Sequence, residues 1–389
     1  MFIIFRIIAD ILWQFKIVSV LVNISMLLAV VGMLYRFKFT TVNIFPIFTL
    51  VFFIIVILLS FLRLVDTETS IIFFKTIFSI FLFVIGMVTK RIFRDSVIAA
   101  KISIGLIIIH VILAIAKIGY QTWGGAYTFS GLYFFKTDLA LSMVLSLIYL
   151  LYFGDLKPLF RFLLVLIGLY IIFITNARIH LLSSFLILVI YYFREKIINS
   201  PKKTILIGAP LIAIGFLLFL LIIQQFLPPD LLLVDLNDFY SDSNMQGRNV
   251  IWETLISKFQ VSSIIDQFFG LGLTADVRIN SLFANTEEVF NAHSTYLYIL
   301  ISFGYVGCLL FLSFVFQMFK RFFKLAIDCK NDQLKQKILM VFFSIWIVFL
   351  VSSFSSVSLI FQQLMWFVFL WAGVLFNSHI FKSKKNKLQ

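Results

Sequence analysis

Long apolar stretches separated by short polar connections recur along the whole chain. Eleven of them are about long enough for a helix to cross the ~30 Å hydrocarbon core of a bilayer. The expected spans are 17–34, 45–62, 71–88, 97–116, 139–153, 159–174, 180–193, 204–223, 295–319, 338–356 and 360–376. The opening stretch 2–13 carries Arg6 and Asp10, so it is either a short twelfth span or an interfacial helix. The pattern predicts an all-α, polytopic integral membrane protein with about 11–12 transmembrane helices.

Composition excludes a water-soluble fold. Hydrophobic residues make up 62% of the 389 positions and charged residues 13%. Soluble globular proteins have about 45–50% apolar and about 25% charged residues. Lipid is therefore the expected solvent for most of the chain. The N-terminal segment lacks a basic lead-in and a small-residue cleavage site, so we expect no removable signal peptide.

The positive charge indicates topology. A formal charge of +14 would suggest a nucleic-acid partner in a soluble protein. With the Lys-rich C-terminal tail placed inside, alternate connections on that side hold 21 of the 32 Lys and Arg, against 9 outside and 2 within spans. Lys and Arg concentrate on the cytoplasmic side of membrane proteins. We therefore expect a cytoplasmic tail and no nucleic-acid partner.

One connection on the outer side is far longer than the others. It covers 224–292, and loops of this length inside a compact protein usually carry function. The chain is thus divided into N-terminal transmembrane helices (1–223), a large outer loop with an amphipathic helix (224–292), and C-terminal helices with a basic cytoplasmic tail (293–389).

The amphipathic helix is expected in RNVIWETLISKF. Trp252, Leu255, Ile256 and Phe259 recur there at helical spacing on one stripe. We expect this stripe to lie on the membrane surface, with Arg248 on the same side because it lies four residues before Trp252. The second outer segment, 117–138, is rich in Gly and aromatic residues, as is typical of an interfacial aromatic belt.

Motif absences and spacing exclude several chemistries. The chain has no Walker loop, no GxGxxG after a strand, no HExxH and no Asp-x-Asp motif, so we expect no nucleotide chemistry, no metal and no cofactor. Lys101 and His110 lie within one span but nine residues apart, about 900° around a helix, and therefore face opposite sides. We do not expect them to form a proton relay.

Cationic side chains remain on the outer side. Arg178 lies in TNARIHLL, Arg248 opens the amphipathic helix, Arg278 follows the turn FFGLGL, and His293 lies in NAHSTYLYILISFGYVG. Each has an ordinary explanation when taken alone: an interfacial arginine, a solvated helix rim or a polar helix cap. Taken together, they resemble a functional constellation.

The segments GRNVIWETLISKF, FFGLGL and AHSTYLYILISFGYVG resemble the large-loop region of the O-antigen ligase and polymerase superfamily of bacterial envelope enzymes. In that family an Arg-x-x-x-Trp helix, a Gly-x-Gly turn and a His at the start of a span recur in this order. TNARIHLL is similar to its Thr-x-x-Arg segment, and SGLYFFKTDLA to its Gly-x-Phe-x-x-Lys-Asn segment. This chain has Ser294 where the family usually has Asn after the His, and Asp138 where it usually has Asn.

The resemblance implies a multi-pass enzyme of the bacterial inner membrane whose active site faces the periplasm. Such enzymes transfer a glycan from undecaprenyl diphosphate to an acceptor hydroxyl. By resemblance Arg178 and Arg248 bind the diphosphate, Arg278 is either a third contact or only a surface charge, and His293 is the general base. Rival bases are Asp276, Glu287 and Glu288. The supporting residues implied are Lys136, Trp252, Gly270, Gly272, Glu287 and Glu288.

The resemblance leaves two functions open, a polymerase and a ligase, and we favour the polymerase. A polymerase joins lipid-linked repeat units, with an inner-membrane chain-length regulator as a further partner, whereas a ligase transfers the finished chain to lipid A-core. The ligases commonly carry a second His close before the His-Asn pair, and this chain has none there. A flippase or a membrane scaffold would explain the helices, but not the 69-residue outer loop with its clustered Arg and His.

Overall fold

The computed structural model describes residues 44–123, 126–200, 248–283 and 291–381, together with eleven positions between 6 and 32. Almost all of these residues are helical. The main helices are α3 (Ile44–Leu62), α4 (Thr67–Val88), α5 (Ile92–Ile115), α6 (Lys136–Phe153), α7 (Pro158–Ile174), α8 (Arg178–Tyr192), α9 (Arg194–Asn199), α12 (Arg248–Gln260), α13 (Ile264–Phe269), α14 (Ala275–Phe283), α15 (Thr295–Asp328), α16 (Gln333–Ser352), α17 (Gln362–Leu375) and α18 (Ser378–Phe381).

The expected all-α, polytopic membrane fold is confirmed. Nine of the eleven expected spans coincide with helices α3–α8 and α15–α17 in the described residues. Six of these helices, α3, α4, α5, α6, α15 and α16, are long and apolar enough to cross a membrane, and α7, α8 and α17 are shorter apolar helices. The expected spans 204–223 and, for the most part, 17–34 lie outside the described residues.

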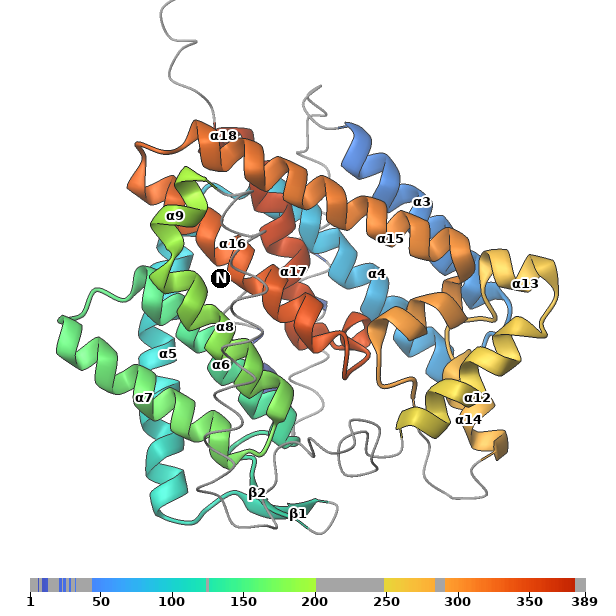
Figure 1. The fold of residues 1–389 in the computed structure, drawn as a ribbon, viewed down its shortest axis with the longest axis horizontal. Coiled ribbons are helices and arrows are strands. Elements are labelled where there is room, and N and C mark those ends of the chain that lie inside the picture. The colour runs from blue at the N-terminus through green and yellow to red at the C-terminus, as the bar shows by residue number, and fades with distance from the viewer. Residues whose placement is uncertain are drawn as a thin grey trace, which may run out of the picture.

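Helix α17 lies at the centre of the bundle, as the ribbon shows (Figure 1). Helices α5–α9 are on one side of it, and α3 and α15 cross on the other. Its backbone approaches α4 closely at two glycines: a Cβ on Gly373 would lie 1.9 Å from the carbonyl oxygen of Phe83, and one on Gly86 would lie 2.1 Å from that of Leu370. Small residues allow such close packing between membrane helices.

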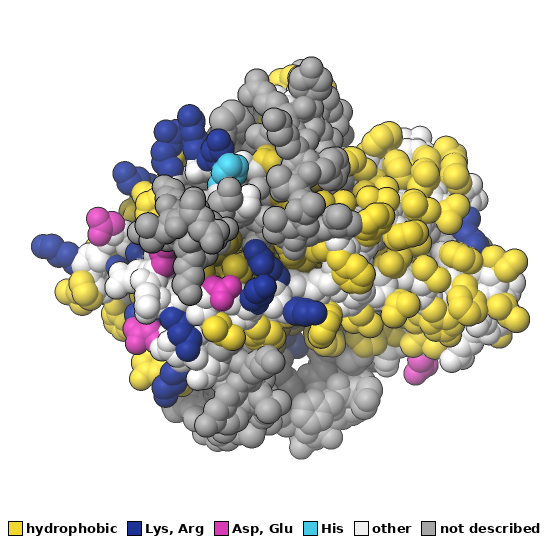
Figure 2. Space-filling view, turned by 90° about the horizontal axis from the view of Figure 1, so that it is seen from above, with side chains coloured by type: hydrophobic (Ala, Val, Ile, Leu, Met, Phe, Trp, Pro, Cys, Tyr) yellow, Lys and Arg dark blue, Asp and Glu magenta, His cyan; other side chains and the backbone are white. Residues whose placement is uncertain are grey.

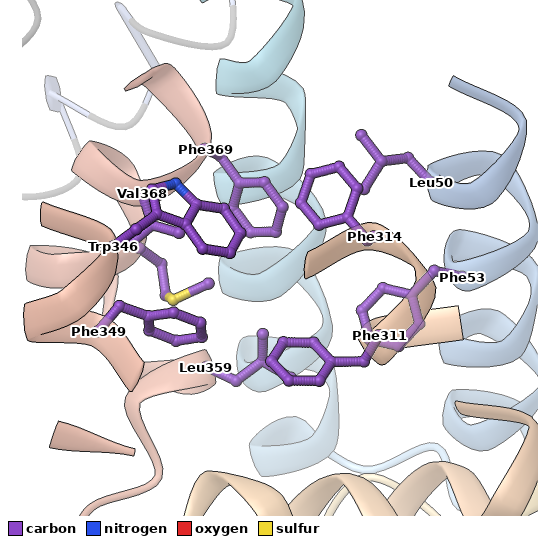
Figure 3. A pocket seen from close by; sticks show the side chains of 10 residues that line it. Leu50, Phe53, Phe311, Phe314, Trp346, Phe349, Leu359, Val368 and Phe369 are labelled. Carbon is purple, nitrogen blue, oxygen red and sulfur yellow. The ribbon is translucent and has the colours of Figure 1, made fainter. Parts of the chain in front are cut away.

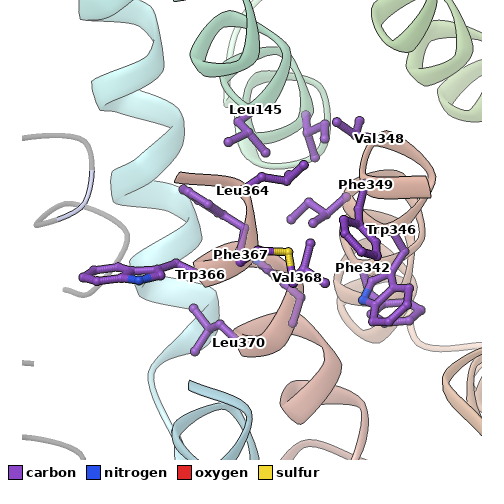
Figure 4. Close-up of a cluster of buried hydrophobic side chains, with 14 of the residues drawn as sticks. Leu145, Phe342, Trp346, Val348, Phe349, Leu364, Trp366, Phe367, Val368 and Leu370 are labelled. Carbon is purple, nitrogen blue, oxygen red and sulfur yellow. The ribbon is translucent and has the colours of Figure 1, made fainter. Parts of the chain in front are cut away.

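Aromatic side chains fill the space between α17 and its neighbours. Trp346 of α16 is buried among Phe314, Phe342 and Phe349, within 6.0 Å centroid to centroid in each case, and the cluster continues through α6 and α17 (Figure 4). The seam with α3 and α15 encloses a void of only about 10 Å³, lined entirely by apolar residues (Figure 3). A single water needs about 10–15 Å³, so this seam is packed core and not a binding site.

The outer surface has the character of a lipid-facing one. Phe45 and Phe48 of α3 are 68% and 54% exposed, and Leu309 and Phe316 of α15 are 70% and 68% exposed. In the view from above, hydrophobic side chains cover one half of the face, and Lys and Arg gather over the other half (Figure 2). Basic residues at that end lie around the α4–α5 turn, on α9 and around the α15–α16 turn: Lys90, Arg91, Arg94, Arg194, Lys196, Lys330 and Lys335.

Two short strands depart locally from the helical pattern. Strands β1 (Tyr120–Trp123) and β2 (Ala126–Phe129) pair antiparallel, with Tyr120 opposite Phe129. Tyr120 and Tyr127 stack at 5.0 Å. Residues 124 and 125 lie outside the described residues. The hairpin lies within the Gly- and aromatic-rich outer segment, at the end of the bundle opposite α9 (Figure 1).

Candidate functional site

A polar cavity of about 530 Å³ opens between the starts of α6, α8 and α12 and the connection between α16 and α17. These elements meet in the lower half of Figure 1. Its polar and charged lining residues are Lys136, Thr137, Asp138, Asn176, Arg178, His180, Arg248, Asn291, His293, Ser352, Ser355, Ser356, Ser358 and Gln363. The cavity therefore lies at the same end of the bundle as the hairpin.

Four residues singled out in the sequence meet in this cavity. Lys136, Arg178, Arg248 and His293 all line it, although they come from four segments far apart in the chain. Among the described lining residues Asp138 is the one carboxylate, against the three basic side chains of Lys136, Arg178 and Arg248. A cavity of this charge is suited to an anion with more than one negative charge.

The basic groups are close enough to affect one another. Burial lowers the pKa of Arg248, and the nearby charge of Arg178 lowers it further. Burial likewise lowers the pKa of His293, with a second contribution from Arg248. Desolvation and like charge both disfavour protonated imidazole, so His293 is held in its neutral, proton-accepting form near neutral pH.

A tight turn determines where Arg178 enters the cavity. Helix α7 ends at Ile174, and Asn176 then takes a left-handed conformation with φ 53°. The Thr175 hydroxyl donates to the carbonyl of Ile172 at 2.6 Å and accepts from the Ala177 N–H at 3.3 Å. The chain reverses within these residues, so Arg178 is the first residue of α8 and lies at the mouth of the cavity.

His293 is held by a turn whose peptide groups are bonded from both sides. The Ala292 N–H donates to Asp276 Oδ2 at 2.9 Å, and the Ala292 carbonyl accepts from Trp252 Nε1 at 2.8 Å. His293 itself has φ 47°, and its N–H donates to Asn291 Oδ1 at 2.9 Å. Left-handed backbone is costly for a residue other than glycine. These bonds hold the imidazole at the cavity wall despite that cost.

We expect Asp276→Ala to destabilise the turn and Asp276→Asn to preserve it. Alanine leaves the buried Ala292 N–H without an acceptor, at a cost of about 1–3 kcal/mol. Asparagine keeps an acceptor oxygen and cannot ionise. Burial raises the pKa of Asp276 to about 6, so the ionised carboxylate of the wild type is disfavoured in the folded protein and its removal costs nothing. Thermal unfolding in detergent should show a lower midpoint for the alanine variant only.

The pH dependence provides a control for this prediction. The unfolded Asp has a pKa near 3.9 and the folded one about 6, so the ionised carboxylate costs stability as pH rises between these values. The advantage of Asp276→Asn over the wild type should therefore grow from about pH 4 to about pH 6 and then level off. An advantage independent of pH would contradict the assignment of Asp276 as a buried acceptor whose ionised form destabilises the fold.

Trp252 can be tested separately through its indole N–H. Trp252→Phe keeps an aromatic ring and removes only the N–H that donates to the Ala292 carbonyl, so we expect the free energy of unfolding to fall by about 0.5–1.5 kcal/mol, measured by thermal unfolding in detergent. Trp346→Phe is the matched control, since the Trp346 Nε1 is buried without a hydrogen-bond partner in the described part of the chain. An equal loss in both variants would indicate that only the size of the indole matters, and that the Trp252–Ala292 hydrogen bond does not stabilise the turn before His293.

Arg278 does not line this cavity. Its Nε donates to the Thr274 carbonyl at 3.4 Å. Its Nη2 lies beside Gly272, because a Cβ built on that glycine would be 3.3 Å from it. It lies near Asp66, whose pKa is lowered mainly by hydrogen bonds from Thr69 and to a smaller extent by the charge of Arg278. The structure therefore gives no support to Arg278 as a third contact to the anion. Glu287 and Glu288 lie outside the described residues.

The glycine turn has a structural role. Gly270 has φ 83°, and a Cβ there would lie 2.2 Å from the carbonyl oxygen of Ser302. Gly304 interrupts α15 with φ 66°, and a Cβ there would lie 2.5 Å from the carbonyl oxygen of Gln267. The Leu271 N–H then donates to Ile301 at 2.7 Å. The turn is therefore docked tightly on the kink of α15, and neither Gly270 nor Gly272 lines the cavity.

A helix forms where the amphipathic helix was expected, but it packs differently from the expectation. Helix α12 buries Leu255 and Phe259, and Phe259 makes an edge-to-face contact with Tyr305 of α15 at 5.5 Å. The expectation that this stripe lies on the membrane surface is therefore wrong for these two residues. Ile256 is 40% exposed. Packing against α15 fixes α12 so that Arg248, its first residue, reaches the cavity.

Several lining residues were not assigned from the sequence. His180, two residues after Arg178, is buried, and its Nδ1 has no hydrogen-bond partner within the described ranges. Asp138 lies at the start of α6, and its carbonyl accepts from Gln363 Nε2 at 3.1 Å. The segment TNARIHLL contains both Arg178 and His180, so the sequence did offer a signal for His180. The grouping of Asp138 with Gln363 depends on tertiary contacts.

A serine-rich connection completes the wall. It runs through VSSFSSVS between α16 and α17, and Ser352, Ser355, Ser356 and Ser358 line the cavity. Thr295 ties it to the start of α15: its hydroxyl donates to the Ser356 carbonyl at 2.8 Å and accepts from the Ser358 N–H at 2.7 Å. Hydroxyl and amide groups of this kind can hydrogen-bond sugar hydroxyls. The expected span 338–356 includes most of this run, so hydropathy did not identify it; the five serines in VSSFSSVS were the signal in the sequence.

No group of three or more His, Cys, Asp or Glu side chains is arranged to hold a metal ion among the residues described here. The ligand-binding groups that the cavity offers are guanidinium, ammonium, imidazole, hydroxyl, amide and one carboxylate. These groups suit recognition of an anion beside a polyhydroxylated molecule.

Comparison with known families agrees with this arrangement. Residues 163–312 match the family model described as O-Antigen ligase. The match includes Arg178, Arg248 and His293, and ends before the serine-rich connection. No curated protein matches the chain. The predicted resemblance to the O-antigen ligase/polymerase superfamily is thus confirmed.

Proposed function

We propose, from the match of residues 163–312 to the O-Antigen ligase family model, that this membrane protein is a polysaccharide polymerase. It joins oligosaccharide repeat units carried on undecaprenyl diphosphate. The single observation that carries the proposal is the meeting of Lys136, Arg178, Arg248 and His293 in one cavity of about 530 Å³. That cavity combines an anion site with a base and a wall of hydroxyl groups.

The arginines are proposed to stabilise the leaving diphosphate. When the glycosidic C–O bond to the diphosphate breaks, the bonding electron pair leaves with the diphosphate oxygen. The diphosphate is already acidic, so this step needs charge stabilisation more than a proton donor. Guanidinium groups remain charged at any relevant pH and pair bidentately with phosphate oxygens. Arg178 and Arg248 take this role without a metal, and Lys136 adds a further positive charge.

His293 is proposed as the general base. The acceptor sugar hydroxyl attacks the anomeric carbon from the face opposite the diphosphate, and its proton passes to the neutral imidazole as the new C–O bond forms. The configuration at the anomeric carbon is thereby inverted. The lowered pKa of His293 supports this role, because the proton-accepting form is present at neutral pH. His180 and the serine-rich wall are available to hold the acceptor sugar.

The reaction is proposed to take place on the periplasmic face of the bacterial inner membrane. The unequal distribution of Lys and Arg supports this orientation, because the basic connections lie at the end of the bundle opposite the cavity. The absence of a second His shortly before His293 supports a polymerase over a ligase that uses lipid A-core as acceptor.

Deletion of the gene in its own host distinguishes the two members. A polymerase acts before transfer of the chain to the final acceptor, so the deletion strain should keep single lipid-linked repeats and lose the ladder of longer glycans on a gel. Complementation with the wild-type gene should restore the ladder, and complementation with His293→Ala should not. Accumulation of long chains on undecaprenyl diphosphate, together with bare core, would instead identify a ligase. Single repeats trapped on the cytoplasmic leaflet would indicate a flippase.

A further inference from the structure

A second hydrophilic cavity lies at the opposite end of the bundle from the candidate site. Its volume is about 310 Å³, and it is lined by Leu151, Tyr152, Gly154, Arg161, Tyr191, Arg194, Glu195, Ile198, Gln333, Gln336, Lys337 and Met340. Helices α6 and α16 contribute to both cavities at their two ends. Asp138 and Tyr152 of α6 are separated by 14 residues, about 20 Å along a helix, so the two cavities are distinct.

Tyr191 organises the basic side of this second cavity. Its hydroxyl accepts from Arg161 Nη1 at 3.1 Å, its carbonyl accepts from Arg194 Nη1 at 3.0 Å, and the Arg194 guanidinium lies 4.6 Å from the centre of its ring. Tyr152 packs edge-to-face against the same ring at 5.4 Å. Two arginines are therefore held in fixed positions beside one aromatic pair.

Arg161 is oriented by neutral groups. Its Nη2 donates to the carbonyls of Gly154 and Leu156 at 3.0 and 3.2 Å, and its Nε is buried with no hydrogen-bond partner among the described residues. Within those residues no carboxylate lies within ion-pair distance of Arg161 or Lys337. Glu195 is the acidic residue in the lining; it lies 3.8 Å from Arg194, and its side chain is 80% exposed. The cavity thus contains three basic groups and one solvated carboxylate.

The cavity lies where lipid headgroups are found. It is bounded by the last residues of α6 and the first residues of α16, two helices that are long and apolar enough to span a membrane. Basic pockets between transmembrane helices at the membrane interface bind anionic headgroups. One water needs about 10–15 Å³, so a cavity of about 310 Å³ also has room for a phosphate group and the atoms attached to it.

We propose that this second cavity binds a phosphate-bearing group through Arg161, Arg194 and Lys337. The phosphate comes either from the headgroup of an anionic phospholipid or from a soluble phosphate compound. Guanidinium groups pair bidentately with phosphate oxygens, and the lysine adds a point charge. Binding links α7, α8, α9 and α16, so it stabilises this end of the bundle. The proposal is independent of the reaction in the other cavity.

The test measures binding of phosphatidylglycerol and phosphatidylcholine to the purified full-length protein in detergent by native mass spectrometry. Arg161 also bonds backbone carbonyls, so the variant used is the double substitution Arg194→Gln with Lys337→Gln. Lys324→Gln with Lys330→Gln is the matched control, since both lysines are exposed at the same end and do not line the cavity. We expect the Kd for phosphatidylglycerol to rise about tenfold in the cavity variant and less than twofold in the control.

A second arm identifies the source of the phosphate. Inorganic phosphate is added to lipid-depleted protein, and the thermal midpoint is recorded. A rise that is lost in the cavity variant but kept in the control supports a soluble phosphate ligand. No rise with phosphate, together with selective phosphatidylglycerol binding, supports a lipid headgroup. Equal binding of phosphatidylglycerol and phosphatidylcholine without a phosphate response, or equal effects of the two double variants, would overturn the proposal.

Discussion

Replacing Arg178 or Arg248 by alanine is expected to reduce polymer formation about 10²–10³-fold while the protein still accumulates in the membrane. Each guanidinium lines the cavity beside the other, and the charge of Arg178 is felt by Arg248. Removing one group that stabilises developing charge in an enclosed site typically costs this much in rate. The measurement is the rate at which lipid-linked repeats are converted to polymer by the purified variants.

Two further substitutions make the arginine test specific. Arg→Lys at position 178 or 248 should recover little activity, because an ammonium group cannot reproduce the bidentate guanidinium geometry. Arg278→Ala is the matched control: it removes an arginine of the same loop that does not line the cavity, so activity should stay within a few fold of wild type. Full activity of both lysine variants, or an equal loss on Arg278→Ala, would leave general surface charge as the explanation.

His293→Ala is expected to lower the rate about 10²–10⁴-fold, the usual range for removal of a general base. Lipid-linked donor should still bind, since Arg178 and Arg248 remain in place. Donor affinity and turnover must therefore be measured separately. His180→Ala is an informative companion, because His180 lines the same cavity. If instead His180→Ala lowers the turnover about 10²–10⁴-fold and His293→Ala keeps the wild-type turnover, the base is His180.

The pH dependence of kcat/KM tests the same role of His293 in the wild-type protein. Its pKa is lowered by burial and then by Arg248. The neutral base should therefore persist to pH values below the ordinary histidine pKa of about 6.5. Activity should rise with pH through a midpoint below that value and be constant near pH 7. A midpoint clearly above 6.5 would contradict the assignment.

Much of the fold could be predicted from the sequence because lipid imposes a simple rule. A segment that crosses the bilayer must satisfy its own backbone hydrogen bonds and present apolar side chains, so hydropathy alone locates the spans. Helices α3 and α4 begin within a few residues of the expected bounds. The packing partners of each span were not predictable, since the close contact of Gly86 with Gly373 joins residues 287 positions apart.

The candidate site was predictable where chemistry and motif coincide. Arg178, Arg248, Lys136 and His293 were named from the sequence, and all four line one cavity. Arg278 was named by the same reasoning, but it follows the glycine turn that docks on the kink of α15, and it lies beside Gly272 and Thr274 and does not line the cavity. Side-chain direction after a left-handed turn depends on the tertiary contacts of that turn.

Tertiary contacts also explain the remaining differences. The stripe of α12 looked like a membrane-surface helix because apolar spacing does not distinguish lipid from a protein neighbour. Leu255 and Phe259 in fact pack within the protein. The link from Trp252 and Asp276 to the Ala292 peptide joins residues 40 and 16 positions apart. No local pattern in the sequence specifies such a link.

The most direct test of the account is polymerisation by the purified protein in detergent. The substrate is single repeat units on undecaprenyl diphosphate, supplied with EDTA and without nucleotide or lipid A-core. We expect the wild type and Arg278→Ala to form polymer with inverted linkages, and Arg178→Ala, Arg248→Ala and His293→Ala to form almost none. If the wild type forms no polymer until lipid A-core or a metal ion is supplied, or if His293→Ala polymerises at the wild-type rate, the account is wrong.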